Sequence, residues 1–240
     1  MKVAAVIVAA GVGVRMGAAI PKAYLPLAGK PILAHTLEVF EAAPEVEEVT
    51  LVVNPPDLEY CQEKVINPFG FKKVLRLVPG GKERQDSVYH GLKVLREQEV
   101  DLVLVHDGVR PLITTGLIRQ IIHAAQKHGA AIPGLPAHET IKRVSPQGEV
   151  VGTLDRRDLW LIQTPQGFKA ELLWRAFLEA YSRGFYGTDE ASLVEQLGAP
   201  VAVLTGSPYN IKITTPEDLR LAELLLPEVR GSEHAGRTGV

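Results

Sequence analysis

A glycine-rich loop with two nearby cations follows the first apolar run of the chain. Gly11 and Gly13 follow residues 3–8 after two alanines, and Arg15 and Lys22 stand beyond them. Glycines let a backbone approach a polyanion and present its N–H groups, and the two side chains add positive charge. The spacing fits neither the Rossmann nor the Walker loop, and glycines alone would favour an ordinary strand-to-helix turn. The two cations instead favour a loop that binds a triphosphate.

Two further segments place polar or charged side chains after later apolar runs. Gly81 and Ser87 belong to a polar loop at residues 80–87, which suits contact with a base or ribose. A solvated connection would give the same pattern. Asp107 follows the fourth apolar run, where a carboxylate suits Mg²⁺ held together with substrate phosphates. A turn aspartate paired with Arg110 explains that position equally well.

Lys212 and Thr188 also carry chemistry but have simple structural explanations. Lys212 lies between two isoleucines, as the outward residue of an edge strand would. Thr188 precedes two acidic residues, as a helix N-cap would. The seven histidines are scattered and lack the paired spacing of metal ligands, so we expect none of them to bind a metal.

Composition limits the class of protein. The 240 residues are 46% hydrophobic, which is enough for a sizeable core, and the formal net charge of -2 argues against bulk nucleic-acid binding. Cys61 is the single cysteine, which excludes a disulfide framework and fits a reducing compartment. No apolar stretch reaches membrane-spanning length. We therefore expect a cytoplasmic protein that does not bind membranes.

Strand-like and helix-like segments alternate along the chain. This alternation predicts an α/β fold of Rossmann-like type, with a mostly parallel sheet and helices on both faces. The predicted strands are residues 3–8, 49–53, 74–78, 102–105 and 201–204. The predicted helices are residues 31–42, 58–66, 87–95, 114–128, 170–183 and 215–226.

One polar segment interrupts this alternation. Residues 139–144 and 149–154 flank a turn that contains proline and glycine, which predicts a β-hairpin. Such a hairpin has little core of its own, so we expect residues 135–159 to form a dimerisation arm that packs on a second subunit. The remainder predicts one domain over residues 1–230 and a flexible tail over 231–240.

Together the motifs resemble those of the 2-C-methyl-D-erythritol 4-phosphate cytidylyltransferase family over nearly the whole chain. The resemblance implies transfer of CMP from CTP to methylerythritol phosphate, with Mg²⁺, in non-mevalonate isoprenoid synthesis. The matching segments are Ala9-Ala10-Gly11-x-Gly13-x-Arg15-Met16, Pro21-Lys22, Gly80-Gly81, Arg84-x-Asp86-Ser87, His106-Asp107-x-x-Arg110-Pro111, Asp155-Arg156, Thr164-Pro165-Gln166, Thr188-Asp189-Glu190-Ala191 and Asn210-Ile211-Lys212-x-Thr214-x-Pro216-Glu217-Asp218.

The resemblance also implies a role for each matching residue and a homodimer whose arms complete the sites. Glycine and alanine positions would wrap the triphosphate, cations would stabilise charge at the α-phosphate, and Asp107 would lie near the metal. The triphosphate residues are Ala9, Ala10, Gly11 and Gly13, and the catalytic cations are Arg15, Lys22, Lys212 and Arg156. Gly81, Arg84 and Ser87 would lie near cytosine and ribose, and Arg110, Thr188, Thr140 and Arg156 near the acceptor, the last two from the partner's arm.

Three other functions are compatible with parts of the pattern. Ribitol 5-phosphate cytidylyltransferases share the fold and the CTP loops, so the nucleotide is better defined than the acceptor. A sugar-phosphate nucleotidyltransferase that uses UTP or GTP is a weaker alternative. A non-catalytic nucleotide-binding protein would have to lack one of the charged residues Arg15, Lys22, Asp107 and Lys212, and all four are present.

Overall fold

The computed structural model describes the backbone of residues 1–11 and 20–238 and the side chains of residues 1–11 and 20–231. Its strands are β1 (Val3–Ala9), β2 (Pro26–Leu27), β3 (Lys30–Pro31), β4 (Glu48–Val53), β5 (Val74–Pro79), β6 (Leu102–Asp107), β7 (Ala130–Pro136), β8 (Lys142–Val144), β9 (Val150–Thr153), β10 (Trp160–Ile162), β11 (Gln166–Lys169) and β12 (Ala202–Thr205). Its α-helices are α1 (Ile32–Ala42), α2 (Leu58–Cys61), α3 (Asn67–Phe69), α4 (Arg84–Leu95), α5 (Thr115–His128), α6 (Ala170–Ser182), α7 (Glu190–Gln196) and α8 (Pro216–Thr238). A π-helical turn, Gln62–Ile66, joins α2 to α3.

The central sheet has eight strands in the order β10-β7-β11-β6-β1-β4-β5, with β12 paired to β7. Strands β6, β1, β4 and β5 run parallel, and so do β7 and β12. Strand β11 lies antiparallel between β6 and β7, and β10 pairs antiparallel with the end of β7. The predicted mostly parallel α/β fold is confirmed, and all five predicted strands are present.

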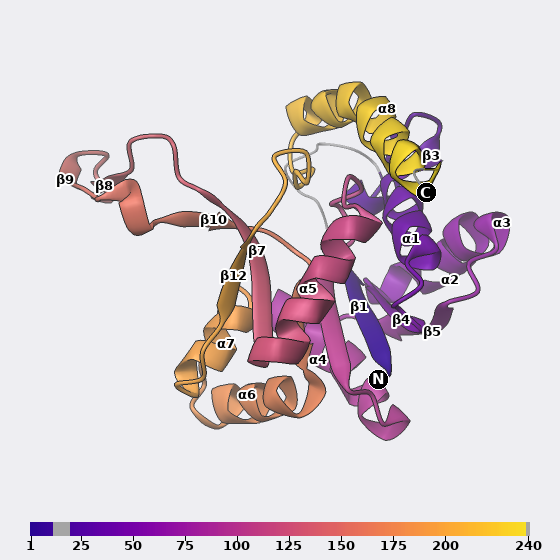
Figure 1. Ribbon diagram of the computed structural model, residues 1–240, viewed down its shortest axis with the longest axis horizontal. Helices are drawn as coiled ribbons and strands as arrows, with labels where there is room; N and C mark the ends of the chain where they lie inside the picture. The colour runs from indigo at the N-terminus through magenta and orange to yellow at the C-terminus, as the bar shows by residue number, and fades with distance from the viewer. Residues whose placement is uncertain (12–19, 239–240) are drawn as a thin grey trace.

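Helices cover both faces of this sheet, as the apolar run of β1 requires (Figure 1). Ala5 and Ile7 face a core shared with α1, α5 and α8, whereas Ala4 and Val6 face a core shared with α4, α6 and α7. A strand buried on both faces reads as continuous apolar sequence because neither side meets water. Because β1, β4, β5 and β6 run parallel, their carboxyl ends all lie at one edge of the sheet.

Three strands of the sheet were missed from the sequence. Strand β7 contains Pro133 and Gly134, which disfavour a strand, and β10 and β11 are short. Burial holds β11 in place: Phe168 is fully buried, and a Cβ at Gly167 would lie 2.8 Å from Cγ2 of Ile121 on α5. Tertiary packing therefore overrides weak local propensity in this half of the sheet.

The predicted hairpin is present as strands β8 and β9, which pair antiparallel. Figure 1 shows it projecting from the body at the end of the long connections through β7 and β10. Its apolar side chains Val144, Val150 and Val151 are all more than half exposed. Exposed apolar side chains on a projecting hairpin are typical of a surface that another protein covers.

Several helix ends differ from the predictions. Helix α4 begins at Arg84 rather than residue 87, because Glu83 and Asp86 form a reciprocal capping box. Asp189, not Thr188, caps α7, with its Oδ1 accepting from the backbone N of Ser192 at 3.0 Å. Helix α8 extends past Pro227 to Thr238, so it includes residues 231–238 of the expected tail. None of the helices in the described part of the chain combines the length and low polarity that a membrane crossing requires.

Candidate active site

A cavity of about 470 Å³ opens where strands β1, β4, β5 and β6 end. It brings together nine residues singled out from the sequence, which come from segments far apart in the chain. These are Ala9, Ala10, Gly11, Lys22, Gly81, Arg84, Ser87, Asp107 and Lys212. Asn54, Lys82 and Glu83 also line it. Gly13 and Arg15 lie outside the described residues.

The second glycine loop packs directly against the first, which explains its glycines. A Cβ on Gly80 would lie 2.5 Å from the Cβ of Ala10, and a Cβ on Gly81 would lie 2.3 Å from that of Asp86. The backbone N of Gly81 donates to Ser87 Oγ at 3.0 Å, and this hydroxyl donates to the Glu83 carbonyl at 3.1 Å. A side chain at either glycine would clash with its neighbours, and Gly81 lines the cavity.

Asp107 lies among cations from three segments. Its Oδ1 accepts from Arg84 Nε at 3.0 Å, and its Oδ2 lies 2.7 Å from Lys212 Nζ. Arg110 is farther away, with Nε 3.9 Å from Oδ2. Burial alone would raise the pKa of Asp107, but the surrounding cations, above all Arg84 and Lys212, hold it below its ordinary value. Asp107 is therefore an ionised carboxylate, and its pairing with Arg110 is the weakest of the three contacts.

Lys212 does not lie on an edge strand, so that explanation of the sequence is wrong. The segment before α8 is irregular, and the fully buried Ile213 anchors it through a backbone hydrogen bond to Val109 at 2.9 Å. Anchoring beside the end of β6 directs the Lys212 ammonium to Asp107. A lysine distant in sequence thereby enters the cavity.

Arg84 lies between two carboxylates, which the sequence did not indicate. Its Nη1 donates to Glu190 Oε1 at 2.7 Å, while its Nε donates to Asp107. Glu190 is 1% exposed. Burial raises its pKa and the Arg84 charge opposes that shift. The sequence showed Glu190 only as an acidic residue in a helix first turn, and no local signal revealed its partner.

A buried hydrogen-bond relay supports Asp107 and Arg110 from behind. Thr164 Oγ1 accepts from the Asp107 backbone N at 3.1 Å. The Thr164 hydroxyl proton is then donated to His106 Nδ1 at 3.0 Å. His106 Nε2 then donates to the Arg110 carbonyl at 3.2 Å. Burial lowers the pKa of His106 to about 3, so the imidazole is neutral. Asn210 extends the relay through its amide, which donates to the Thr164 carbonyl at 2.8 Å.

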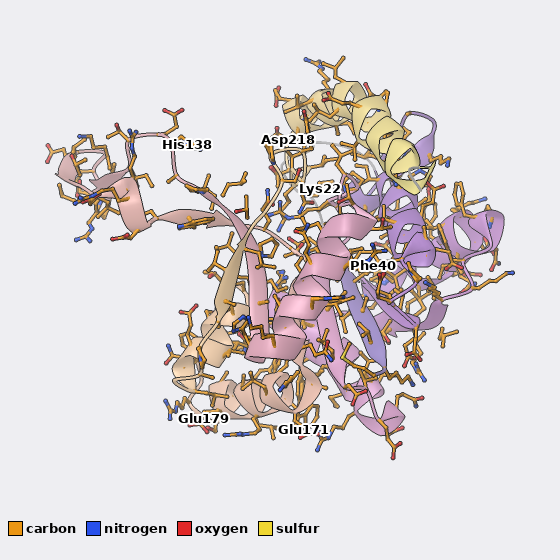
Figure 2. All side chains as sticks on the ribbon, viewed as in Figure 1. Lys22, Phe40, His138, Glu171, Glu179 and Asp218 are labelled. Carbon is orange, nitrogen blue, oxygen red and sulfur yellow. The ribbon has the colours of Figure 1, made fainter. Side chains whose placement is uncertain are left out.

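The four predicted acceptor residues do not line this cavity in the described part of the chain. Arg110 lies behind it, donating to the Asn210 carbonyl at 2.7 Å, and Thr188 is exposed before α7. Thr140 and Arg156 lie on the arm, where Arg156 donates to the His138 carbonyl. Figure 2 labels His138 on the arm and Lys22 in the body. One chain therefore does not bring its own arm residues to its own cavity.

The residues present could hold Mg²⁺ only together with a phosphate ligand. Within the described residues, no three His, Cys, Asp or Glu side chains gather into a preformed metal site. Mg²⁺ commonly uses one or two carboxylates and completes its shell with water and substrate phosphates. Asp107 fits that use if Lys212, whose side chain is 38% exposed, moves from Oδ2 to a phosphate.

The doubly covered sheet and the cationic cavity at its strand ends are typical of an α/β protein that binds a phosphorylated ligand there. The family model for 2-C-methyl-D-erythritol 4-phosphate cytidylyltransferase matches residues 3–228. The chain belongs to this family.

Individual relatives agree with the family assignment. A protein of that name from Geotalea uraniireducens is 50% identical over 230 residues, covering 95% of this chain and 98% of its own. One from Syntrophus aciditrophicus is 44% identical over 230 residues, covering 96% of this chain and 98% of its own. The crystal structure of 4-diphosphocytidyl-2C-methyl-D-erythritol synthase from Anaerococcus prevotii superposes with a TM-score of 0.82 at 32% identity, over 94% of this chain and 96% of that one.

Proposed function

We propose that this protein transfers CMP from CTP to 2-C-methyl-D-erythritol 4-phosphate in the cytoplasm, giving the CDP-alcohol and pyrophosphate. The observation that carries the proposal is the cavity in which two glycine loops, Lys22, Lys212 and Asp107 converge. Family membership supports the same reaction. The buried free thiol of Cys61 is compatible with a reducing compartment.

The nucleotide would lie between the two glycine loops. Ala9, Ala10 and Gly11 offer backbone close to the triphosphate, with Gly13 and Arg15 continuing that loop in sequence. Gly81 and Ser87 offer a rigid loop for ribose and cytosine. Arg84 contributes by holding the cavity wall, since its guanidinium already bonds two carboxylates.

The chemistry needs positioned charge rather than a general base. A phosphate oxygen of the acceptor attacks the α-phosphorus of CTP, and the bond from that phosphorus to the bridging oxygen of the β-phosphate breaks, releasing pyrophosphate. The acceptor phosphate is already ionised near neutral pH, so no proton must be removed. Lys22, Lys212 and Arg15 would stabilise the charge that grows on the α-phosphate. By analogy with a lost oxyanion-hole donor, removal of one cation costs on the order of 10² to 10³ in rate, or ~3 to 4 kcal/mol.

Asp107 would hold Mg²⁺ with the CTP phosphates. When bound, Mg²⁺ supplies further positive charge to the triphosphate and to the leaving pyrophosphate. Lys212, which is paired with the same carboxylate, would then contact the α-phosphate. The ion pair of 2.7 Å therefore keeps this lysine next to the place where it would act.

The acceptor would bind across a two-fold homodimer interface. Arg110 and Thr188 belong to the body, whereas Thr140 and Arg156 lie on the projecting arm. The exposed valines of the arm support its burial by a second subunit. Each site would then combine the cavity of one protomer with the arm of its partner.

Purified protein assayed with each of the four nucleoside triphosphates against methylerythritol phosphate and ribitol 5-phosphate tests the proposal. We expect pyrophosphate release to require Mg²⁺ and to be fastest with CTP and methylerythritol phosphate. Equal or faster turnover with UTP or GTP would refute the base assignment. Faster turnover with ribitol 5-phosphate would refute the acceptor assignment.

Kinetics of single variants test the individual roles. Lys22→Ala, Lys212→Ala and Arg15→Ala should mainly lower kcat, because the charge they meet grows toward the transition state. Arg110→Ala and Thr188→Ala should mainly raise KM for the acceptor. A kcat near wild type in Lys212→Ala would remove that lysine from the catalytic step.

A further inference from the structure

Glu190 is a buried carboxylate that reaches the candidate site through Arg84, a residue that lines the cavity. It is the first residue of α7, it is 1% exposed, and it does not line the cavity. Its Oε1 accepts from Arg84 Nη1 at 2.7 Å, and its Oε2 has no hydrogen-bond partner among the described residues. A buried ion pair adds little to stability, because the cost of removing the charges from water offsets their attraction. The contact between Glu190 and Arg84 is therefore better explained by a role in the site.

Arg84 is anchored at both ends of its guanidinium. Its Nη1 bonds Glu190 on α7 and its Nε bonds Asp107 Oδ1 at the end of β6. Arg84 itself begins α4, so the chain Glu190–Arg84–Asp107 joins three elements. With Oδ1 fixed by Arg84, the second oxygen of Asp107 faces Lys212. Without the Glu190 anchor, the planar guanidinium could rotate about its long side chain and release Oδ1.

Two hydrogen bonds that do not involve the Glu190 side chain hold the start of α7 on the sheet. Gln166 on β11 donates to Asp189 Oδ2 at 2.7 Å and accepts from the Ala191 backbone N at 3.0 Å. These two bonds flank Glu190 and hold the helix start on the sheet. A change in the Glu190 side chain therefore acts on Arg84 more than on the fold.

We propose that Glu190 is a positioning residue, which holds Arg84 so that Asp107 presents one oxygen to the cavity. This inference rests on the proposed function, in which that oxygen meets Mg²⁺ with the CTP phosphates. Glu190→Gln keeps a carbonyl acceptor at the position of Oε1, whereas Glu190→Ala removes it. If Glu190 acts by orienting Arg84, the alanine variant should be severely impaired and the glutamine variant only mildly.

Calorimetric titration of CTP, in EDTA and in excess Mg²⁺, tests the proposal apart from turnover. For Glu190→Ala we expect CTP affinity in EDTA within about twofold of wild type and a Mg²⁺-dependent gain in affinity reduced at least about tenfold, with kcat reduced at least about tenfold. Glu190→Gln should stay within about threefold in each quantity. Glu195→Ala, an exposed glutamate on the same helix, is the matched control and should equal wild type.

Arg84→Lys tests the same connection from its other end. A lysine lacks the planar fork that bonds two carboxylates at once, so it should reproduce the loss of the Mg²⁺-dependent gain. Thermal unfolding of each variant verifies that it is folded. If Glu190→Ala does not fold, the Mg²⁺-dependent gain measured for Arg84→Lys decides the proposal instead.

Three results would overturn the inference. One is a Glu190→Ala enzyme with wild-type kcat and Mg²⁺ gain. Another is a loss of CTP affinity that is equal with and without Mg²⁺, which indicates general damage. The third is Glu190→Gln as impaired as Glu190→Ala, which assigns the effect to charge. A wild type that neither binds CTP nor releases pyrophosphate would instead refute the proposed function.

Discussion

Mixing two inactive variants tests whether each site is built from two chains. Lys212 lines the cavity in the body and Arg156 lies on the projecting arm. If the arm completes the partner's site, Lys212→Ala and Arg156→Ala homodimers each lack one catalytic cation at both sites. Each should retain on the order of 10⁻² to 10⁻³ of wild-type activity, by analogy with a lost oxyanion-hole donor.

Co-refolding the two variants in equal amounts should restore activity to roughly a quarter of wild type, because of the two-fold arrangement. With random pairing, half of the dimers are mixed. In a mixed dimer, one site carries both defects and the other carries neither. One site in four across the whole population is therefore intact.

Pyrophosphate release is measured before and after unfolding in denaturant and refolding, with wild type taken through the same steps. Lys212→Ala mixed with Lys22→Ala is the matched control. Both of these residues line the cavity of the same body, so every site in a mixed dimer keeps one defect and activity should stay at the level of the parents.

A Lys212→Ala and Arg156→Ala mixture that stays inactive, while wild type refolds fully, would refute the shared site. Arg156 would then act within its own chain or have no part in catalysis. Recovery in the Lys212→Ala and Lys22→Ala control would equally contradict the reasoning, because these residues cannot complement each other across the dimer.

Three further predictions follow from packing and burial. Gly81→Ala would place a Cβ 2.3 Å from that of Asp86, which completes the capping box of α4, so KM for CTP should rise roughly fivefold or more. Gly116→Ala is the control; its Cβ would have its nearest contact at 3.9 Å, and KM should stay unchanged. Phe40→Ala empties a fully buried site and should lower the free energy of unfolding in urea by about 3 to 5 kcal/mol, against less than about 0.5 kcal/mol for Leu224→Ala, which is 77% exposed. Burial lowers the pKa of His35, so the unfolded chain binds the extra proton below pH ~6.5; unfolding free energy should fall as pH drops through that range, and His35→Gln should make the fall shallower. An unchanged pH slope in that variant would exclude His35 as a source of the acid sensitivity.

The sequence by itself determined the parallel half of the sheet and the segments that carry the site. The runs that became β1, β4, β5 and β6 are apolar because both faces are covered, and this burial is visible as composition. Their carboxyl ends meet at one edge in any such sheet. Gly11, Gly81 and Asp107 could therefore be placed near one another from the sequence.

Tertiary structure alone decided what the charged side chains contact. Arg84 was expected near ribose and cytosine; it lines the cavity, and its guanidinium also joins Asp107 to Glu190, which lies 106 residues after Arg84 in the sequence. Lys212 could have been an edge-strand residue, and only the anchoring of Ile213 directs it to Asp107. Ion pairs between distant segments leave no periodic pattern, because they depend on the distance between two side chains after folding.

The antiparallel half of the sheet was decided in the same way. Strands β7 and β11 have weak local propensity. Close packing of Gly167 against α5 and burial of Phe168 hold β11 between β6 and β7. The hairpin could be predicted because its turn is encoded locally in a few consecutive residues. Turns and apolar runs can be predicted from consecutive residues, whereas the partners of buried charges and of short strands are fixed only when the whole chain packs.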